Sequence, residues 1–210
     1  LTEDDKDYGP LALGSMTHGI SPLEMAAAYA IFGNGGKYTT PHCYTTVEDS
    51  SGEIILEKKV NSVQAISSQT AYIMNRVMTQ VLNSADGRGT GQGLATNRME
   101  SLGKTGTTSD DKDHWFIGLT PYYVTASWLG YDDPATLTVR HYATHPPTVA
   151  WRKVMNVSQR DLEYKSFDVP NGIVVQDFCV DTGMLANANC PTREKGYYTE
   201  DNMPDVCQSH

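Results

Sequence analysis

Three consecutive strand-like segments with short links constrain the fold of this chain more than any other feature. They are residues 102–108, 114–119 and 123–129, each rich in β-branched and aromatic residues or in strict alternation. A charged turn, 109–113, separates the first two, and Pro121 marks the turn between the last two. Because strands joined by short links pair antiparallel, the sequence predicts a three-stranded antiparallel meander. Its first strand either pairs with an upstream strand outside this sequence or forms an open edge.

Helices are predicted on both sides of this meander in the sequence. Ser21, Pro22 and Glu24 form a strong helix start with a capping box, and Ser67 or Ser68 caps a second helix. The predicted helices cover residues 22–31, 67–86 and 149–161. On the second of them, Met74 and Met78 are interpreted as core residues, and Asp86 to Thr96 is predicted to be a loop.

A small hairpin is predicted between the first two helices. Residues 44–47 and 54–56 read as strands, and the turn residues 49–52 lie between them. Helices alternating with short antiparallel strands predict an α+β fold, in which the helices pack against an antiparallel sheet.

The first strand of the meander carries the residues with the clearest chemistry. Lys104 and Gly106 should share one face of this strand, and Thr105 and Thr107 the other, because neighbouring side chains point to opposite faces. Gly106 has no side chain, so a second backbone can approach it closely. A cation and several hydroxyls beside such a gap suit an extended peptide that carries a negatively charged group.

A phosphate-binding loop is the competing interpretation of residues 102–108. A Walker A motif requires a glycine five residues before Gly103, and Arg98 stands there instead. The glycine-rich segment 89–93 also fails the dinucleotide pattern, because Leu94 replaces its third glycine. The remaining interpretation is the Lys-Thr-Gly element of serine acyl-transferases.

The net charge and the hydropathy limit the classes of binding partner that this chain can have. The net charge of −9 and the absence of a basic stripe exclude a nucleic-acid partner. No run of 18 apolar residues is present, so we expect no membrane contact by this chain, and no signal peptide is visible. The sequence starts as if in the middle of a protein. If the parent protein is exported, we expect its export signal upstream of this sequence.

The C-terminal residues differ in character from the rest. A boundary near residue 165 separates residues 1–165 from an extension, 166–210, which is rich in turn residues and for which we predict one strand at 169–175. Three of the four cysteines lie in this extension: Cys179, Cys190 and Cys207. No Cys-x-x-Cys pair exists, so we expect no metal site and consider a Cys190–Cys207 disulfide, with free thiols as the alternative.

Several motifs in order resemble class A, bifunctional penicillin-binding proteins. They are residues 11–25 before and within the first helix, 33–36 at its end, 103–108, 115–118 with Thr120-Pro121, and 128–132. The resemblance covers roughly residues 1–160, and residues 181–186 with Cys190-Pro191 resemble the extension of some members. It implies the penicillin-binding and serine β-lactamase-like fold, incomplete at its N-terminal side.

The same resemblance implies a D,D-transpeptidase that cross-links peptidoglycan stem peptides and binds β-lactams at the extracytoplasmic face of the bacterial membrane. Lys104 then supplies positive charge at the active-site wall, and the N–H of Thr107 donates to the oxyanion. Thr105 and Thr107 offer hydroxyls to the substrate carboxylate, and Gly106 leaves room for its backbone. Thr108 and Trp115 complete the predicted substrate-binding set, with Trp115 alternatively only a core aromatic. No cofactor is implied.

The sequence departs from the family in one decisive way: it lacks the nucleophile motif Ser-x-x-Lys in a suitable context, and Ser-x-Asn altogether. Ser101 to Lys104 and Ser109 to Lys112 match by letters, but one lies in a strand and the other in a charged turn, not at a helix N-terminus. We therefore expect the fragment to be inactive by itself and to need the N-terminal part of the domain, in the same or a separate chain. The alternatives are a non-catalytic peptide- or protein-binding module and a serine β-lactamase, which the motifs at 21–25 and 128–132 disfavour.

The remaining polar clusters receive structural interpretations. Residues Asp110, Asp111, Asp113 and His114 are expected to form a solvated turn rather than a cation site, because the spacing of a calcium loop is missing. We expect His141 and His145 to be surface residues, and Trp128 to be a core aromatic.

Overall fold

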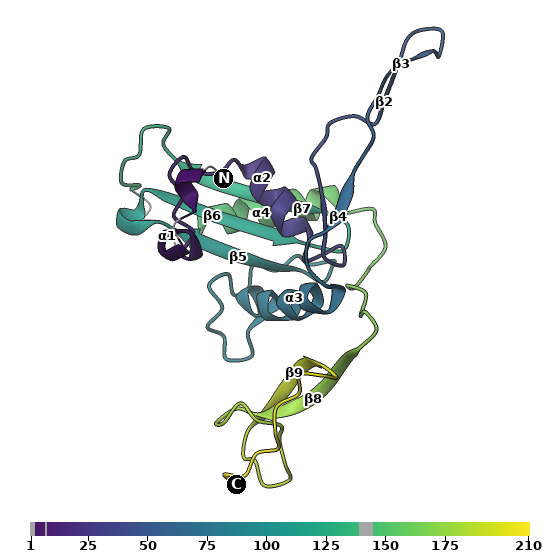
Figure 1. The fold of residues 1–210 in the computed structure, drawn as a ribbon. Helices are drawn as coiled ribbons and strands as arrows, with labels where there is room; N and C mark the ends of the chain where they lie inside the picture. Colours follow the sequence, from purple (N-terminus) through teal and green to yellow (C-terminus); the bar gives the residue numbers. More distant parts are fainter. Residues whose placement is uncertain (1–2, 7, 139–144) are drawn as a thin grey trace.

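A three-stranded antiparallel sheet forms the centre of the molecule (Figure 1), in a computed structural model that describes residues 3–6, 8–138 and 145–210. The strands are β5 (Leu102–Thr107), β6 (Asp113–Leu119) and β7 (Val124–Gly130), in the order β5-β6-β7. The predicted meander and the α+β class are thereby confirmed. Among the described residues, β5 pairs only with β6, so its other edge is open.

Two helices cover opposite faces of this sheet. Helix α2 (Pro22–Ala30) packs on one face of β6 and β7, and α4 (Pro146–Ser158) packs on the other, behind the sheet in Figure 1. Helix α3 (Ser68–Asn83) lies alongside β5. The sheet is therefore enclosed on both faces, and α3 flanks the start of β5, where Leu102 is buried, whereas Lys104 farther along the strand is exposed.

The helix starts follow the predicted capping chemistry. The Glu24 carboxylate accepts a hydrogen bond from the Ser21 N–H (3.0 Å), and the Glu24 N–H donates to Ser21 Oγ (3.2 Å). At α3, Ser67 rather than Ser68 is the cap, because its Oγ accepts from the Thr70 N–H at 3.0 Å. Helix α4 begins three residues before the predicted start because prolines are accepted in a first helical turn.

Each face of the sheet has its own apolar core. The cluster on the α2 face contains Met78, Leu102, Leu119 and Phe167, and the cluster on the α4 face contains Leu82, Phe116, Trp151 and Met155. Gly118 makes the second cluster possible: a Cβ there would lie 2.3 Å from the Trp151 ring. Phe167 lies just beyond the predicted boundary at residue 165 and yet packs in the sheet core; the boundary stays a prediction.

Two small sheets lie near α2 and away from the centre. The predicted hairpin consists of β2 (Thr46–Glu48) and β3 (Ile54–Glu57), which project from the molecule in Figure 1. Strands β1 (Lys37–Thr39) and β4 (Ser62–Gln64) pair at its base. The sequence analysis missed β4, because three mostly exposed residues carry no hydrophobic pattern.

The C-terminal extension is a second hairpin, and the prediction of a single strand was wrong. Strands β8 (Ile173–Cys179) and β9 (Arg193–Thr199) pair along their full length. The sequence analysis missed β9 because its residues are mostly polar and show no apolar alternation. Backbone pairing with β8, rather than burial, holds this strand. The hairpin touches α3 where the rings of Tyr72 and Tyr197 meet edge to face, with centroids 6.0 Å apart.

The three C-terminal cysteines are buried and carry free thiols, so the predicted Cys190–Cys207 disulfide is not formed. Their sulfur atoms converge on one centre instead of pairing two by two. Cys43 is also free and is exposed. The described chain is completed by short helical segments, η1 (Glu3–Asp5), α1 (Tyr8–Ala12) and η2 (Ser109–Asp111), and none of its helices is long and apolar enough to cross a membrane.

Candidate functional site

Strand β5 places the predicted site residues on two faces of the sheet. The register pairs Lys104 with Ile117 and Gly106 with Trp115, whereas Thr107 pairs with His114. Directly opposed residues on antiparallel strands share a face. Lys104, Gly106 and Trp115 therefore lie on the α2 face, and Thr107 lies on the α4 face, in agreement with the predicted alternation.

The register of β5 against β6 determines which backbone N–H and C=O groups of β5 point away from β6. The Thr108 N–H donates to the Asp113 carbonyl on β6 at 3.2 Å. Because backbone groups of successive strand residues point to opposite edges, the N–H and C=O groups of Thr105 and Thr107 point away from β6. The contact between Lys104 Nζ and the Thr105 carbonyl, at 2.7 Å, agrees with this direction. These two residues can pair with an extended peptide or donate to an oxyanion.

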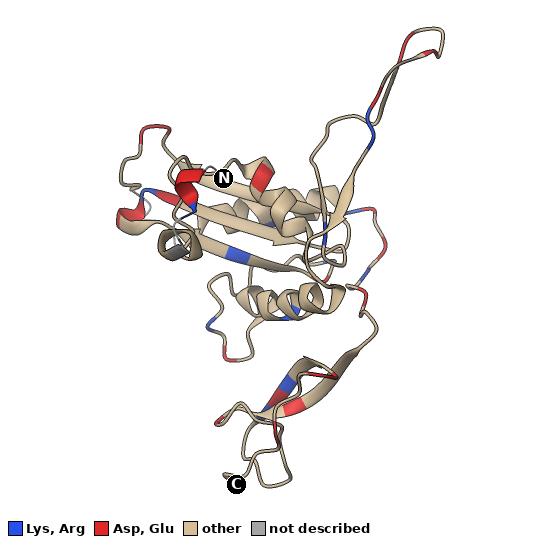
Figure 2. Ribbon diagram, in the orientation of Figure 1, with Lys and Arg blue, Asp and Glu red and all other residues tan. Residues whose placement is uncertain are grey.

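Lys104 is exposed and lies on the strand as the only basic residue of β5, visible as a single blue band in Figure 2. Its ammonium group has the Thr105 carbonyl as its hydrogen-bond acceptor and makes no ion pair with a described carboxylate. The positive charge at this edge is therefore available to an anionic ligand.

A residue that the sequence analysis did not select joins the site through Thr105. The hydroxyls of Thr90 and Thr105 lie 2.8 Å apart, and Thr90 belongs to the loop between α3 and β5. This loop is held against the end of α3, where the Gly91 N–H donates to the Val81 carbonyl at 2.9 Å. Only the fold brings Thr90 to the strand, because no sequence pattern links two threonines fifteen residues apart.

Thr108 has a local structural bond. Its Oγ1 accepts from the Asp113 N–H at 2.9 Å and so closes the turn between β5 and β6. Within this turn, Asp110 and Asp111 adopt left-handed backbone conformations with φ of 63° and 53°. The hydroxyl of Thr108 thus fixes the end of the strand that carries the other site residues.

Gly106 and Trp115 face each other across β5 and β6. A Cβ at Gly106 would lie 3.2 Å from the Trp115 Cβ. Because glycine has no side chain, no atom projects from the sheet at this position. Trp115 and Trp128 both aim their indole N–H groups at Asp113 Oδ2, at 3.4 and 3.2 Å. Both tryptophans are held by this carboxylate; Trp115 is half-buried, whereas Trp128 is exposed, so the expectation that Trp128 is a core aromatic was wrong.

Two histidines stack near the end of β5: His114, which was expected in a solvated turn, is buried, and His145, which was expected at the surface, is half-buried. His114 is 7% exposed, and its ring stacks on that of half-buried His145 with centroids 5.1 Å apart and planes 8° apart. The His114 Nε2 also lies 3.3 Å from Asp111 Oδ1. Burial lowers the pKa of His145 below its ordinary value, and the neighbouring His114 lowers this pKa further. The other histidine interpreted as a surface residue, His141, lies outside the described residues.

Of the two serines that match the nucleophile pattern by letters, Ser109 lies in the predicted turn, whereas Ser101 directly precedes β5 and does not lie in a strand as predicted. Ser101 is 2% exposed, and its Oγ accepts from the Thr96 N–H at 3.3 Å. Ser109 lies in η2, the short turn between two strands. Neither stands at the start of an α-helix.

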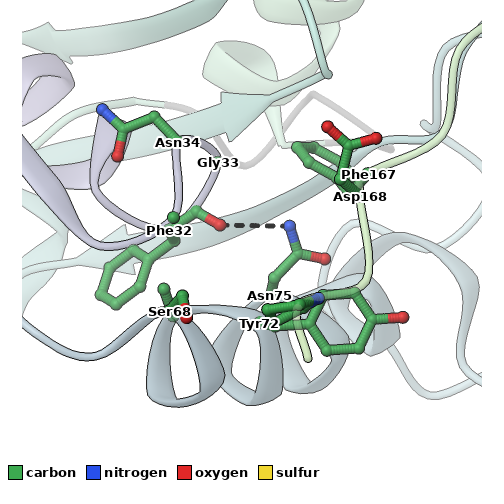
Figure 3. Close-up of a pocket in the computed structure, with 11 residues that line it drawn as sticks. Phe32, Gly33, Asn34, Ser68, Tyr72, Asn75, Phe167 and Asp168 are labelled. Carbon is green, nitrogen blue, oxygen red and sulfur yellow. Dashed lines mark hydrogen bonds between the residues drawn. The ribbon is translucent and has the colours of Figure 1, made fainter. Parts of the chain in front are cut away.

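One cavity is lined by no residue of β5 and by none of the predicted site residues. It has a volume of about 300 Å³ and lies between the end of α2, the start of α3 and residues 167–170 (Figure 3). Asn75 spans one wall and donates to the Phe32 carbonyl at 3.2 Å. This cavity contains none of the predicted catalytic groups, so the candidate site is the open edge of β5 rather than a closed pocket.

Comparison with known proteins identifies the family of this chain. The family model described as penicillin binding protein transpeptidase domain matches residues 5–141. Penicillin-binding protein 1A of Clostridium tetani is 32% identical over 100% of this chain, and that of Clostridium acetobutylicum is 37% identical over 82%. The chain spans only 28% and 21% of those two relatives.

A solved structure supports the fold. Penicillin-binding protein 1A from Haemophilus influenzae aligns with a TM-score of 0.76 at 23% identity, over 88% of this chain and 32% of that one. The family model and the two relatives show that the chain belongs to the penicillin-binding-protein transpeptidase family. Within it, the chain corresponds to the C-terminal part of class A relatives that are named penicillin-binding protein 1A.

Proposed function

We propose that this chain is the Lys-Thr-Gly wall of a serine D,D-transpeptidase that cross-links peptidoglycan stem peptides and is acylated by β-lactams. One observation carries the proposal: β5 has an open edge, at which the backbone of Thr105 and Thr107 faces outward beside the unpaired cation of Lys104. A peptide ending in D-Ala-D-Ala can add to this edge as an extra strand. Its terminal carboxylate then meets Lys104 and the threonine hydroxyls.

Each site residue has a role in this proposal. The outward N–H of Thr107 donates to the oxyanion that forms when a serine attacks the peptide carbonyl. Thr105, held by the Thr90 hydroxyl, and Gly106 shape the edge along which the substrate backbone lies. Thr108 fixes the turn, and Trp115 borders the substrate on the α2 face.

The nucleophile belongs to another part of the transpeptidase domain in this proposal. Ser101 is buried, and its hydroxyl accepts a hydrogen bond from the backbone N–H of Thr96. Ser109 lies in a turn, so neither serine is positioned for attack. The partners are the stem peptide, β-lactams and the N-terminal part of the domain, on the extracytoplasmic face of the membrane. The chain alone is then inactive.

Labelling with a fluorescent penicillin tests the proposal. The parent protein should become covalently labelled, and Lys104→Ala should slow labelling by roughly 10²–10³-fold, the loss typical of removing one group that stabilises developing negative charge. Lys112→Ala is the matched control, because this exposed lysine lies in the adjacent turn, and it should leave the rate unchanged.

Two outcomes would contradict the proposal. A parent protein that takes no label would favour the alternative, a non-catalytic module that binds a peptide at the open edge of β5. A label on the 210-residue chain alone that disappears in Ser101→Ala would place the nucleophile inside this chain.

A further inference from the structure

Three thiols converge in the C-terminal hairpin, far from β5. Cys179 ends β8, Cys190 lies in the loop between β8 and β9, and Cys207 follows β9. Their exposed fractions are 0%, 4% and 1%, and their sulfur atoms all lie within 4.8 Å of one another. Residues separated by up to 28 positions thus present three soft ligands to one buried point.

The backbone around Leu185 holds two of these cysteines in place. The Cys207 N–H donates to the Leu185 carbonyl at 2.8 Å, and the Cys179 N–H donates to the neighbouring Met184 carbonyl at 2.8 Å. Isolated bridges join Leu185 to Phe178 and to Val206. The positions of the thiols therefore follow from hydrogen-bonded backbone and not from flexible side chains alone.

The sulfur atoms also accept hydrogen bonds from the protein. The Asn187 N–H donates to Cys190 Sγ at 3.3 Å, and Thr182 Oγ1 donates to Cys207 Sγ at 3.4 Å. Such donors stabilise thiolates and orient them toward a metal.

His210 is a candidate for a fourth ligand because it lies near Cys179. His210 and Asp181 form a second group with Cys179, in which the ligand atoms lie within 4.8 Å of one another. The His210 Nε2 lies 3.4 Å from Asp181 Oδ2. Histidines that bind zinc commonly make such a bond to a carboxylate through their other nitrogen.

We propose that Cys179, Cys190 and Cys207 bind a structural zinc ion, with His210 as the fourth ligand. Three thiolates and one imidazole are a common tetrahedral zinc set. With Zn–S bonds of about 2.3 Å, tetrahedral sulfur atoms lie roughly 3.8 Å apart, so the observed cluster needs little contraction. Binding Zn²⁺ releases one proton from each of the three thiols. The missing Cys-x-x-Cys spacing argued against this site, but the hairpin brings the ligands together without it.

The hairpin gains stability from such a site because its apolar core is small. Its cluster of buried residues consists of the three cysteines, with only half-buried Ala186 packed against them. Domains with cores of this size are usually held by metals or disulfides. One disulfide would use two thiols and leave the third buried beside it, whereas zinc uses all three.

Metal analysis of the full 210-residue chain tests the proposal. The chain is purified under reducing conditions with added zinc and then dialysed extensively. Inductively coupled plasma mass spectrometry should then find one zinc ion per chain. Replacement by Co²⁺ should give the sulfur charge-transfer and ligand-field absorption of a tetrahedral thiolate site. The absence of bound metal from a chain with free thiols would overturn the proposal, as would a disulfide among the three cysteines after anaerobic purification.

Thiol reactivity gives a readout that does not depend on variants. With zinc bound, only exposed Cys43 should react rapidly with a thiol reagent, and a chelator should expose three more thiols. Equal reactivity with and without zinc would contradict the site.

Variants then assign the ligands. Cys207→Ser should lose the metal, whereas Cys43→Ser, the matched control outside the cluster, should keep full stoichiometry. His210→Gln should shift the cobalt absorption bands and weaken zinc binding, and His42→Gln should change neither. An unchanged cobalt spectrum in His210→Gln would remove His210 from the ligand set.

Discussion

The sheet region and the C-terminal hairpin reach order by different means. The sheet is enclosed by α2 and α4, and two apolar clusters fill its two faces. The hairpin of β8 and β9 has seven paired positions but buries little besides three cysteines. Hydrophobic burial holds most of the first region, whereas the second relies on backbone pairing and, in our proposal, on a zinc ion bound by its thiols.

The comparison also separates two kinds of function. In the sheet region the chemistry lies at an open strand edge, where a cation and outward-facing backbone groups meet solvent. In the hairpin the reactive groups are turned inward and shielded. An exposed edge suits a substrate that comes and goes, and a buried cluster suits a permanent structural ligand.

The largest effect should follow from removing the central aromatic residue of the sheet region. Trp151 is fully buried and packs edge to face on Phe116 with ring centroids 5.0 Å apart. Trp151→Ala should lower the free energy of unfolding by about 3–5 kcal/mol, measured by urea denaturation. Trp128→Ala, at a residue that is 38% exposed, is the control and should cost less. The thiol reactivity of the hairpin should stay unchanged in both variants; a change would mean that the two regions are not independent.

A smaller effect is expected from filling the space above Gly118. A methyl group there would meet the Trp151 ring at 2.3 Å, so Gly118→Ala should lower the free energy of unfolding by about 1–3 kcal/mol. Gly106→Ala is the comparison within the same sheet, because its methyl group would lie 3.2 Å from the Trp115 Cβ. Denaturation should find the Gly106 variant closer to the native protein. If the two variants lost equal stability, the tight packing of the α4 face would not be the cause.

Helix α3, which touches both regions, offers a matched pair of serines. Ser67→Ala removes the hydrogen bond to the Thr70 N–H and should cost about 1 kcal/mol of stability in thermal or urea unfolding. Ser68→Ala leaves the cap intact, since the Ser68 hydroxyl bonds the Gln69 side chain instead. A larger loss in the Ser68 variant would contradict the assignment of Ser67 as the cap.

The smallest effect concerns pH and the histidine pair of the sheet region. Burial, and next the charge of His114, lower the pKa of His145 in the folded state. The unfolded state therefore takes up a proton first as the pH falls below about 6.5. Stability should be unaffected above that pH and should decrease from there toward the folded-state pKa. The half-exposed ring keeps this loss small.

Urea midpoints measured across this pH range check the prediction. His145→Gln should flatten this part of the profile, and His42→Gln, at an exposed histidine, should leave it unchanged. A steeper loss in the His145 variant would show that another group is responsible.

Patterns within a few residues were sufficient to predict much of the fold. The capping serines, the meander and the alternation of Lys104 with Thr105 all depend on local geometry, and each agrees with the structure. Local patterns failed where burial or pairing depends on distant residues. Of the two methionines interpreted as core residues, only Met78 is buried, whereas Met74 is 39% exposed.

By itself, then, the sequence determined the α+β class, the family resemblance and the strand that carries the site. Only the tertiary structure decided the contact of Thr90 with Thr105, the stacking of His114 on His145 and the meeting of three cysteines. The physical reason is the same in each case. A hydrogen-bonded ladder or a packed core sets distances between residues that are far apart in the chain, and sequence spacing carries no information about those distances.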